Sequence, residues 1–186
     1  MVMKKSILMI FVFFVLVNWH ISALVYGQTR ELITGACGFK LGEILDTRKF
    51  NFKGKASGFE EYREVSPRIP NKIFVTYALK VSPISNTIVK IQATGKMDDF
   101  ITGCKKNAPL GLTAALTHKY GNPEIVRSSD GDFFDSFHWT DISGAQIKQY
   151  CGMGIYFVTY SSKALDKLFE VETKQAANKM VDDTGL

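Results

Sequence analysis

Ile73–Ala93 reads IFVTYALKVSPISNTIVKIQA and contains two runs in which successive side chains alternate between two sides of an extended backbone. Apolar residues occupy one side of the first run, and they are Ile73, Val75, Tyr77, Leu79 and Val81. The second run, from Thr87 to Ala93, alternates in the same way. This period of two is typical of half-buried strands, and Ser82–Asn86 between the runs has the length of a hairpin loop. The stretch therefore predicts an antiparallel β-hairpin.

Upstream of this hairpin we expect two elements. Gly35–Leu45 has Leu41, Ile44 and Leu45 at helical spacing, which favours a short helix. Phe59–Val65 favours a strand, because two prolines follow it closely and end any regular element.

Downstream, the pattern predicts a helix, a second hairpin, a long strand and a last helix. Their expected ranges are Pro109–Tyr120, Ile125–Ser129 with Phe133–Thr140, Ala145–Tyr160, and Ala164 to about Met180. Gly152 and Gly154 in the long strand indicate a bulge or a close backbone approach. Runs of neighbouring strands interrupted by helices favour an α+β fold. We expect an antiparallel sheet built from hairpins, with helices packed on one face and a helix–hairpin unit roughly repeated.

Composition limits the class of protein. The chain has 186 residues, of which 46% are hydrophobic and 22% are charged. These fractions exclude a disordered or low-complexity chain, and the length fits one domain. Three cysteines are too few for a disulfide scaffold.

Residues 1–27 have the pattern of a signal peptide. Lys4 and Lys5 precede the apolar run Ile7–Val17, and cleavage after Gly27 would leave residues 28–186 as a single α+β domain. The alternative is a retained membrane anchor, in which Asn18 and His20 would be costly to bury. We therefore expect an exported protein, periplasmic or extracellular.

Cleavage would remove two lysines and no acidic residue, which lowers the formal net charge from +5 to +3. A small, unclustered positive charge gives no reason to expect nucleic-acid binding. The predicted contact with a membrane is through the signal segment alone.

An exported chain meets an oxidising compartment, where one disulfide and one remaining thiol are expected from three cysteines. Packing of a helix on the sheet favours the pair Cys104 and Cys151, although every pairing with Cys37 stays open.

Familiar enzymatic motifs are absent from the sequence. The enzyme hypothesis is a cell-envelope hydrolase that uses Cys37 with His118 and His138. An inert or disulfide-bonded Cys37 is the simpler interpretation in an exported protein. We predict no catalytic residue, although the sequence leaves enzymatic activity open.

A calcium loop is the metal site suggested by Asp130, Asp132 and Asp135. Their spacing does not match an EF-hand, and Asp130-Gly131 is foremost a hairpin turn. We therefore predict no metal and no cofactor.

Two segments are candidate binding surfaces. The first mixes basic and aromatic residues, namely Arg48, Lys49, Phe50, Phe52 and Lys53. A strand edge protected by lysines is the alternative interpretation. The second is the strand side that carries Tyr156 and Tyr160, which is exposed if the helices pack on the opposite side and buried if both sides are covered.

The run Leu116–Pro123, LTHKYGNP, resembles the L-x-x-K-Y-G-x-P element of small exported bacterial proteins of unknown function. Gly38–Gly42, Pro67–Pro70 and Phe74-x-x-Tyr77 resemble the same type. Ser57–Tyr62 is similar to the S-G-x-x-Y loop of lysozyme-inhibitor families, with one residue more. Neither resemblance implies catalytic residues.

From these observations we expect an exported, non-catalytic module that binds a protein partner at the periplasm or cell envelope. An inhibitor or an immunity protein is one form of this role. The alternatives are the cysteine–histidine hydrolase and a small-ligand carrier, which would need an apolar pocket between sheet and helices.

Overall fold

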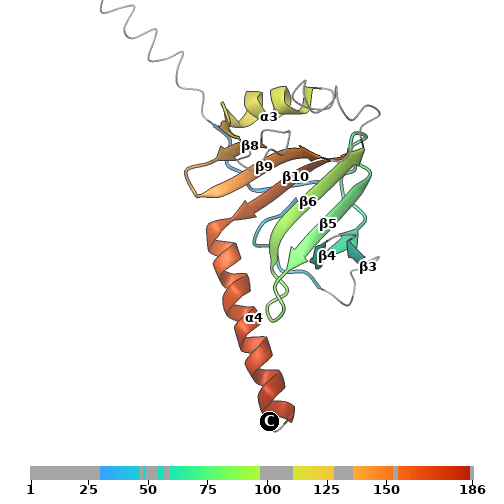
Figure 1. Ribbon diagram of the computed structural model, residues 1–186, viewed down its shortest axis with the longest axis vertical. Coiled ribbons are helices and arrows are strands. Elements are labelled where there is room, and N and C mark those ends of the chain that lie inside the picture. Colours follow the sequence, from blue (N-terminus) through green and yellow to red (C-terminus); the bar gives the residue numbers. More distant parts are fainter. Residues whose placement is uncertain are drawn as a thin grey trace, which may run out of the picture. The chain divides into compact units, whose positions relative to one another are not determined.

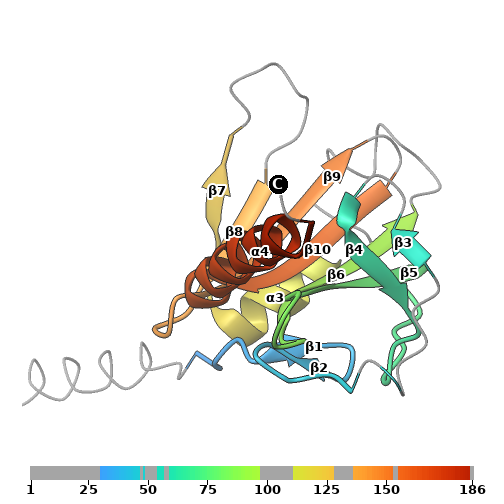
Figure 2. The same cartoon turned by 90° about the horizontal axis from the view of Figure 1, so that it is seen from below.

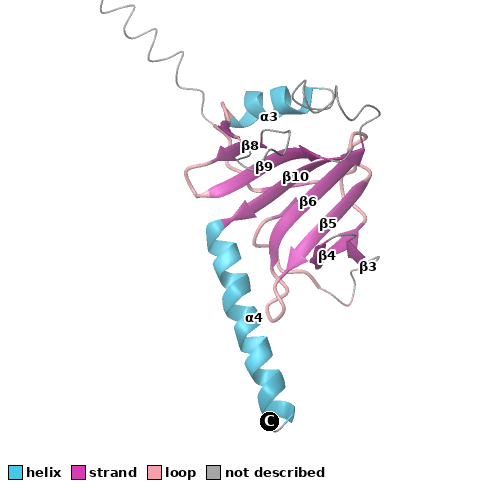
Figure 3. Cartoon of the chain, viewed as in Figure 1, coloured by secondary structure: helices cyan, strands magenta, loops and turns pink. Residues whose placement is uncertain are grey.

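The structure is a computed structural model that describes residues 30–46, 48, 54–56, 59–96, 111–127, 136–152 and 155–184. The chain divides into two units, Met1–Arg30 and Glu31–Leu186. The described part of the second unit is α+β, with antiparallel strands and two helices (Figure 3).

Eight antiparallel strands of the described chain form one sheet in the order β3-β4-β5-β6-β10-β9-β8-β7. Their bounds are β3 Gly54–Ala56, β4 Phe59–Val65, β5 Thr76–Val81, β6 Ile88–Lys96, β7 Glu124–Val126, β8 Ser136–Thr140, β9 Ala145–Gly152 and β10 Ile155–Ser162. The sheet thus consists of two four-strand meanders that meet where β6 pairs with β10. The hairpin predicted from Ile73–Ala93 is confirmed as β5 and β6.

Gly95 of β6 lies directly opposite Tyr156 of β10. A Cβ atom at Gly95 would overlap the Tyr156 ring, so this position requires glycine. The ring is buried, and its hydroxyl donates a hydrogen bond to the carbonyl of Ile73. Tyr156 therefore packs across the pair of strands that joins the two meanders.

Residues directly opposite each other in the ladders point to the same side of the sheet, which defines two faces. The first face carries the apolar core, which includes Leu79, Ile91, Ile147 and Val158. The second face carries their sequence neighbours and is more polar.

Helix α3, Leu112–Tyr120, covers the first face over β8, β9 and β10. Leu112, Leu116 and Tyr120 pack into the same cluster as Trp139, and the Trp139 Nε1 donates to the Gly121 carbonyl at 2.9 Å. Gly121 ends the helix by donating its N–H to the carbonyl of Thr117. The described part of the predicted Pro109–Tyr120 helix is therefore confirmed.

The segment before β3 covers the rest of the first face. Phe39 and Leu45 pack with the side chains of β5 and β6. Gly35–Ala36 (β1) and Phe39–Lys40 (β2) form a small hairpin, in which Cys37 and Gly38 both have positive φ angles, of 57° and 84°. The predicted helix over Gly35–Leu45 is therefore wrong, because left-handed residues in the middle of the segment reverse the chain.

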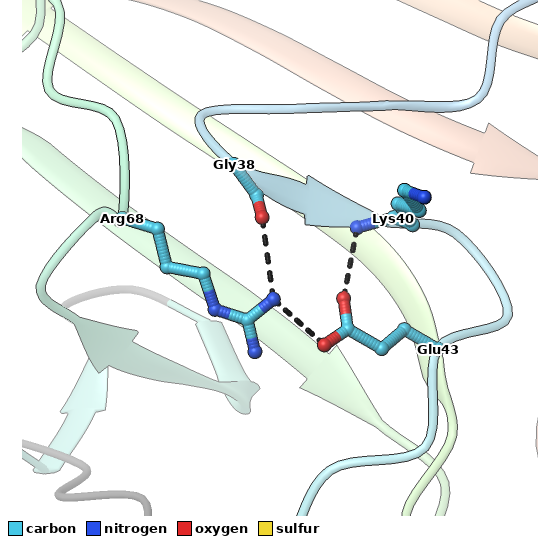
Figure 4. A network of polar contacts seen from close by, with 4 residues as sticks. All are labelled: Gly38, Lys40, Glu43 and Arg68. Carbon is cyan, nitrogen blue, oxygen red and sulfur yellow. Dashed lines mark hydrogen bonds and ion pairs between the residues drawn. The ribbon is translucent and has the colours of Figure 1, made fainter.

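The β1–β2 hairpin is fastened to the segment that follows β4 (Figure 4). Arg68 donates to the Gly38 carbonyl and forms a 2.7 Å ion pair with Glu43, and the backbone N–H of Lys40 donates to Glu43. The Arg68 guanidinium also lies 4.9 Å from the centre of the Phe39 ring. These contacts hold Phe39 in the core.

Helix α4, Lys163–Thr184, follows β10 and continues past the loop between β5 and β6 (Figure 1). It contacts the second face, where Asp166 pairs with Lys90 at 3.0 Å and the Phe169 ring lies 3.8 Å from the Lys80 ammonium. Lys80 and Lys90 are directly opposite each other in β5 and β6. The two helices thus contact opposite faces, which corrects the expectation that helices pack on one face.

Four further expectations remain, three of which concern the second half of the chain. The long strand over Ala145–Tyr160 is two paired strands, β9 and β10, so Gly152 ends the first strand instead of marking a bulge, and Gly154 lies outside the described residues. The second hairpin is confirmed as β7 and β8, and the last helix as α4. Repetition of a helix–hairpin unit stays a prediction.

Substitution of Gly95 with alanine tests the packing of Tyr156. We expect the variant to lose about 1–3 kcal/mol of unfolding free energy, because the new methyl group and the ring cannot occupy one place. Urea unfolding measures the loss. Thr94→Ala, on the other face of the same strand, is the control and costs less than about 1 kcal/mol. Equal losses of unfolding free energy in Gly95→Ala and Thr94→Ala would contradict the packing of the Tyr156 ring against Gly95.

Substitution of Glu172 with glutamine tests the attachment of α4. The buried Glu172 carboxylate accepts from the backbone N–H groups of Ile84 and Ser85 at 3.0 and 2.9 Å. Burial raises the pKa of Glu172, but the hydrogen bonds from Ser85 and Ile84 lower it by more. The pKa of Glu172 therefore lies below its ordinary value. We expect a loss of about 1–2 kcal/mol at pH 7, since glutamine forms weaker, uncharged hydrogen bonds.

The same substitution predicts a change in pH dependence. A depressed pKa stabilises the fold above the unfolded-state value of about 4.3, and this stabilisation is lost as the pH falls through the lower folded value. The difference between wild type and Glu172→Gln should therefore shrink below about pH 4. The exposed neighbour Glu170→Gln is the control, and urea midpoints at several pH values measure the effect. A constant difference across this range would contradict the proposed role of the charge.

Candidate functional site

Strand β7 forms one edge of the described sheet and pairs with β8 on one side (Figure 2). All three of its residues are exposed, and two of them, Ile125 and Val126, are apolar. Ile125 is 56% exposed although its opposite neighbour, Phe137, is buried. An edge strand with exposed apolar side chains can accept another strand.

The turn after β8 and the N-terminal segment that is hydrogen-bonded to it carry two further exposed apolar side chains. Ile142, in the turn Asp141–Gly144, is 98% exposed. Leu32 is also exposed, and it precedes Ile33, whose N–H donates to the Asp141 carboxylate at 2.7 Å. We define the edge patch as the exposed apolar residues of these three segments, Leu32, Ile125, Val126 and Ile142.

Asp141 organises the turn that presents Ile142. Its carboxylate accepts from the N–H and hydroxyl of Ser143 at 2.8 and 2.6 Å, and from the N–H of Ala145 at 3.1 Å. Burial raises the pKa of Asp141, but these bonds and the one from Ile33 lower it below its ordinary value overall. The charged carboxylate therefore holds the turn and the N-terminal segment together.

The predicted basic–aromatic segment is described only at Arg48, which is exposed and donates its backbone N–H to Asp46 at 3.2 Å. Lys49, Phe50, Phe52 and Lys53 lie outside the described residues. Their role in binding stays a prediction.

Tyr156 and Tyr160 lie on the first face, in the core. Tyr156 is 1% exposed, and Tyr160 is partly buried between the two core clusters. Burial raises the pKa of Tyr160, with smaller effects from Tyr120 and Cys37. Of the two alternatives left open for this side of the strand, Tyr156 therefore follows the buried one.

The three residues of the hydrolase hypothesis lie in separate places. Cys37 packs beside the core on the first face, His138 lies on the second face of β8, and His118 is exposed on α3. Cys37 is a free thiol, and burial raises its pKa to about 11. A thiol with this pKa is a poor nucleophile at neutral pH.

The described residues contain no group of three or more side chains that could hold a metal ion. Asp130, Asp132 and Asp135 lie outside them. None of the described helices is both apolar enough and long enough to span a bilayer.

Sequence reasoning missed the edge patch. The signal was present in Ile125-Val126, which begins two residues after Pro123, and in an isoleucine inside the turn Asp141–Gly144. Neither position indicates a binding surface until the sheet order shows that β7 lies at an edge.

Comparison with known protein families, characterised proteins and solved structures gives no match. We therefore infer function from the residues of this chain.

The cysteines provide a test that separates binding from thiol chemistry. We expect Cys37 to react with iodoacetamide at pH 7 at least about tenfold more slowly in the folded chain than in the denatured chain, because burial disfavours its thiolate. We also predict a Cys104–Cys151 linkage in non-reducing peptide maps. Rapid modification of folded Cys37 at pH 7, or a disulfide that includes Cys37, would contradict this assignment.

Proposed function

We propose that this chain is an exported, non-catalytic module that binds a protein partner at the periplasm or cell envelope. The observation that supports this proposal is the edge patch, in which exposed Ile125 and Val126 lie on an edge strand. Removal after Gly27 of the signal-like residues 1–27 is part of the proposal.

Strand addition is the binding mode that fits this edge. An extended segment of the partner would pair with the backbone of β7, and its side chains would contact Ile125 on one side of the sheet and Val126 on the other. Ile142 and Leu32 lie on segments joined by the Ile33–Asp141 hydrogen bond, and they would enlarge the apolar contact. An inhibitor or an immunity protein is a concrete form of this role, because such proteins act by occupying a surface.

The proposal also includes an internal repeat that differs from the expected helix–hairpin unit. A four-strand meander precedes each helix, with β3–β6 before α3 and β7–β10 before α4. We propose that these are the two repeated units, and that β7 and β3 are equivalent edge strands. The second unit would then carry the partner site.

Affinity capture with matched variants tests the proposed function. The purified chain is immobilised, exposed to an envelope extract of the source cells at moderate salt, and the retained proteins are identified by mass spectrometry. We expect one stoichiometric partner, and about tenfold or greater weakening by Ile125→Lys, because a charge would be placed in an apolar contact.

Ile69→Lys is the control, since Ile69 is 66% exposed and lies on a different segment. This variant should retain the partner as the wild type does. Circular dichroism checks that both variants are folded. Repeated captures without a partner, or equal retention by Ile125→Lys, would overturn the proposal.

A further inference from the structure

Strand β7 presents charge as well as apolar surface. Its first residue, Glu124, is exposed, and Arg127, which follows directly after its last residue, is exposed too. These two residues border Ile125 and Val126, so the edge reads acidic, apolar, apolar, basic along the chain. We call Glu124–Arg127 the edge tetrad.

The charges of the edge tetrad can pair with an added strand. Among the described residues, no ion pair includes Glu124 or Arg127. The residue opposite Glu124 in β8 is His138, whose pKa is lowered by burial and by the charge of Lys148, although Glu124 raises it. His138 is therefore mostly uncharged at neutral pH and does not neutralise Glu124.

The geometry of the sheet determines what a strand added at β7 must offer. Every strand pairing in the described sheet is antiparallel, which favours an antiparallel added strand. Opposite residues share a face, so an apolar residue opposite Ile125 extends the first face and one opposite Val126 extends the second. Opposite charges directly across two strands stabilise the pairing, and like charges destabilise it.

We propose that the partner segment at β7 has the order acidic, apolar, apolar, basic, and that it adds antiparallel to the edge tetrad. Its acidic residue then lies opposite Arg127 and its basic residue opposite Glu124. This inference rests on the proposed function, because it specifies the segment that binds at the same edge. Apolar contact with Ile125 and Val126 supplies affinity, and the two flanking charges select the segment and its direction.

A second copy of this chain does not provide that segment, although Glu124–Arg127 itself has the required order. Two copies of β7 that join their outer edges in one antiparallel sheet are related by a two-fold axis perpendicular to the sheet, which keeps each face on its own side. Residues 124 and 127 point to opposite faces in an extended chain. The rotation therefore cannot place one opposite the other, and the segment belongs to a different protein.

NMR titration of the purified chain with two synthetic peptides of equal composition tests this inference. The matched peptide is acetyl-TSTDVIKTST-amide, and the reversed peptide is acetyl-TSTKVIDTST-amide. We expect the matched peptide to shift the amide signals of Ile125 and Val126 and to bind about tenfold more tightly than the reversed peptide. The reason is that, in the reversed peptide, both charge pairs change from attractive to repulsive. Tighter binding of the reversed peptide would indicate parallel addition and overturn the proposal.

A double variant that exchanges the two charges, Glu124→Lys with Arg127→Glu, should invert this preference. A folding defect cannot invert a preference between two peptides of equal composition. Glu170→Lys with Lys174→Glu is the control, since both residues are exposed on α4, and it should keep the preference of the wild type.

The remaining outcomes separate this inference from the proposed function. Equal binding of both peptides, or an unchanged preference in the charge-exchanged variant, would overturn the charge pattern and leave strand addition at β7 in place. Binding of neither peptide, with an envelope partner still captured through Ile125, would overturn the inference alone. Preference for the matched peptide without any captured partner would overturn the proposed function and support the charge pattern.

Discussion

Each of the two meanders is built from strands that follow one another in the chain. The pairing of β6 with β10 joins the two meanders, and the described sheet depends on this pairing. This pairing brings Gly95 opposite Tyr156, so the tyrosine ring lies across the junction. Phe74 packs against the same ring at 5.7 Å, and the tyrosine hydroxyl reaches the Ile73 carbonyl just before β5. A buried ring of β10 that contacts β6 and the segment before β5 fixes the register in which the meanders meet.

Two charged side chains then attach the flanking segments to this sheet. Glu172 of α4 accepts from the loop between β5 and β6, and Asp141 accepts from Ile33 as well as from its own turn. In both cases a carboxylate binds backbone N–H groups that would otherwise lack partners within secondary structure. The position of α4 and the presentation of Ile142 therefore depend on ionised carboxylates instead of apolar contacts alone.

Much of the fold was predictable from local pattern. Strict alternation defined β5 and β6, and Gly121 with Pro123 indicated the end of α3. The predictions that were wrong concern segments whose conformation depends on tertiary structure. Positive φ angles at Cys37 and Gly38 turned apparent helical spacing into a hairpin. Gly152 lies at the end of β9, and periodicity alone cannot distinguish the end of a strand from a bulge.

The candidate sites were less predictable than the fold, for a physical reason. Whether a strand is central or at an edge, and which face a helix covers, is set by pairing between residues far apart in sequence. Tyr156 and Phe157 are adjacent aromatic residues of β10, yet one is 1% exposed in the core and the other is half-buried on the second face. Local pattern shows that they point to opposite sides, and the sheet order decides which side is buried in the core.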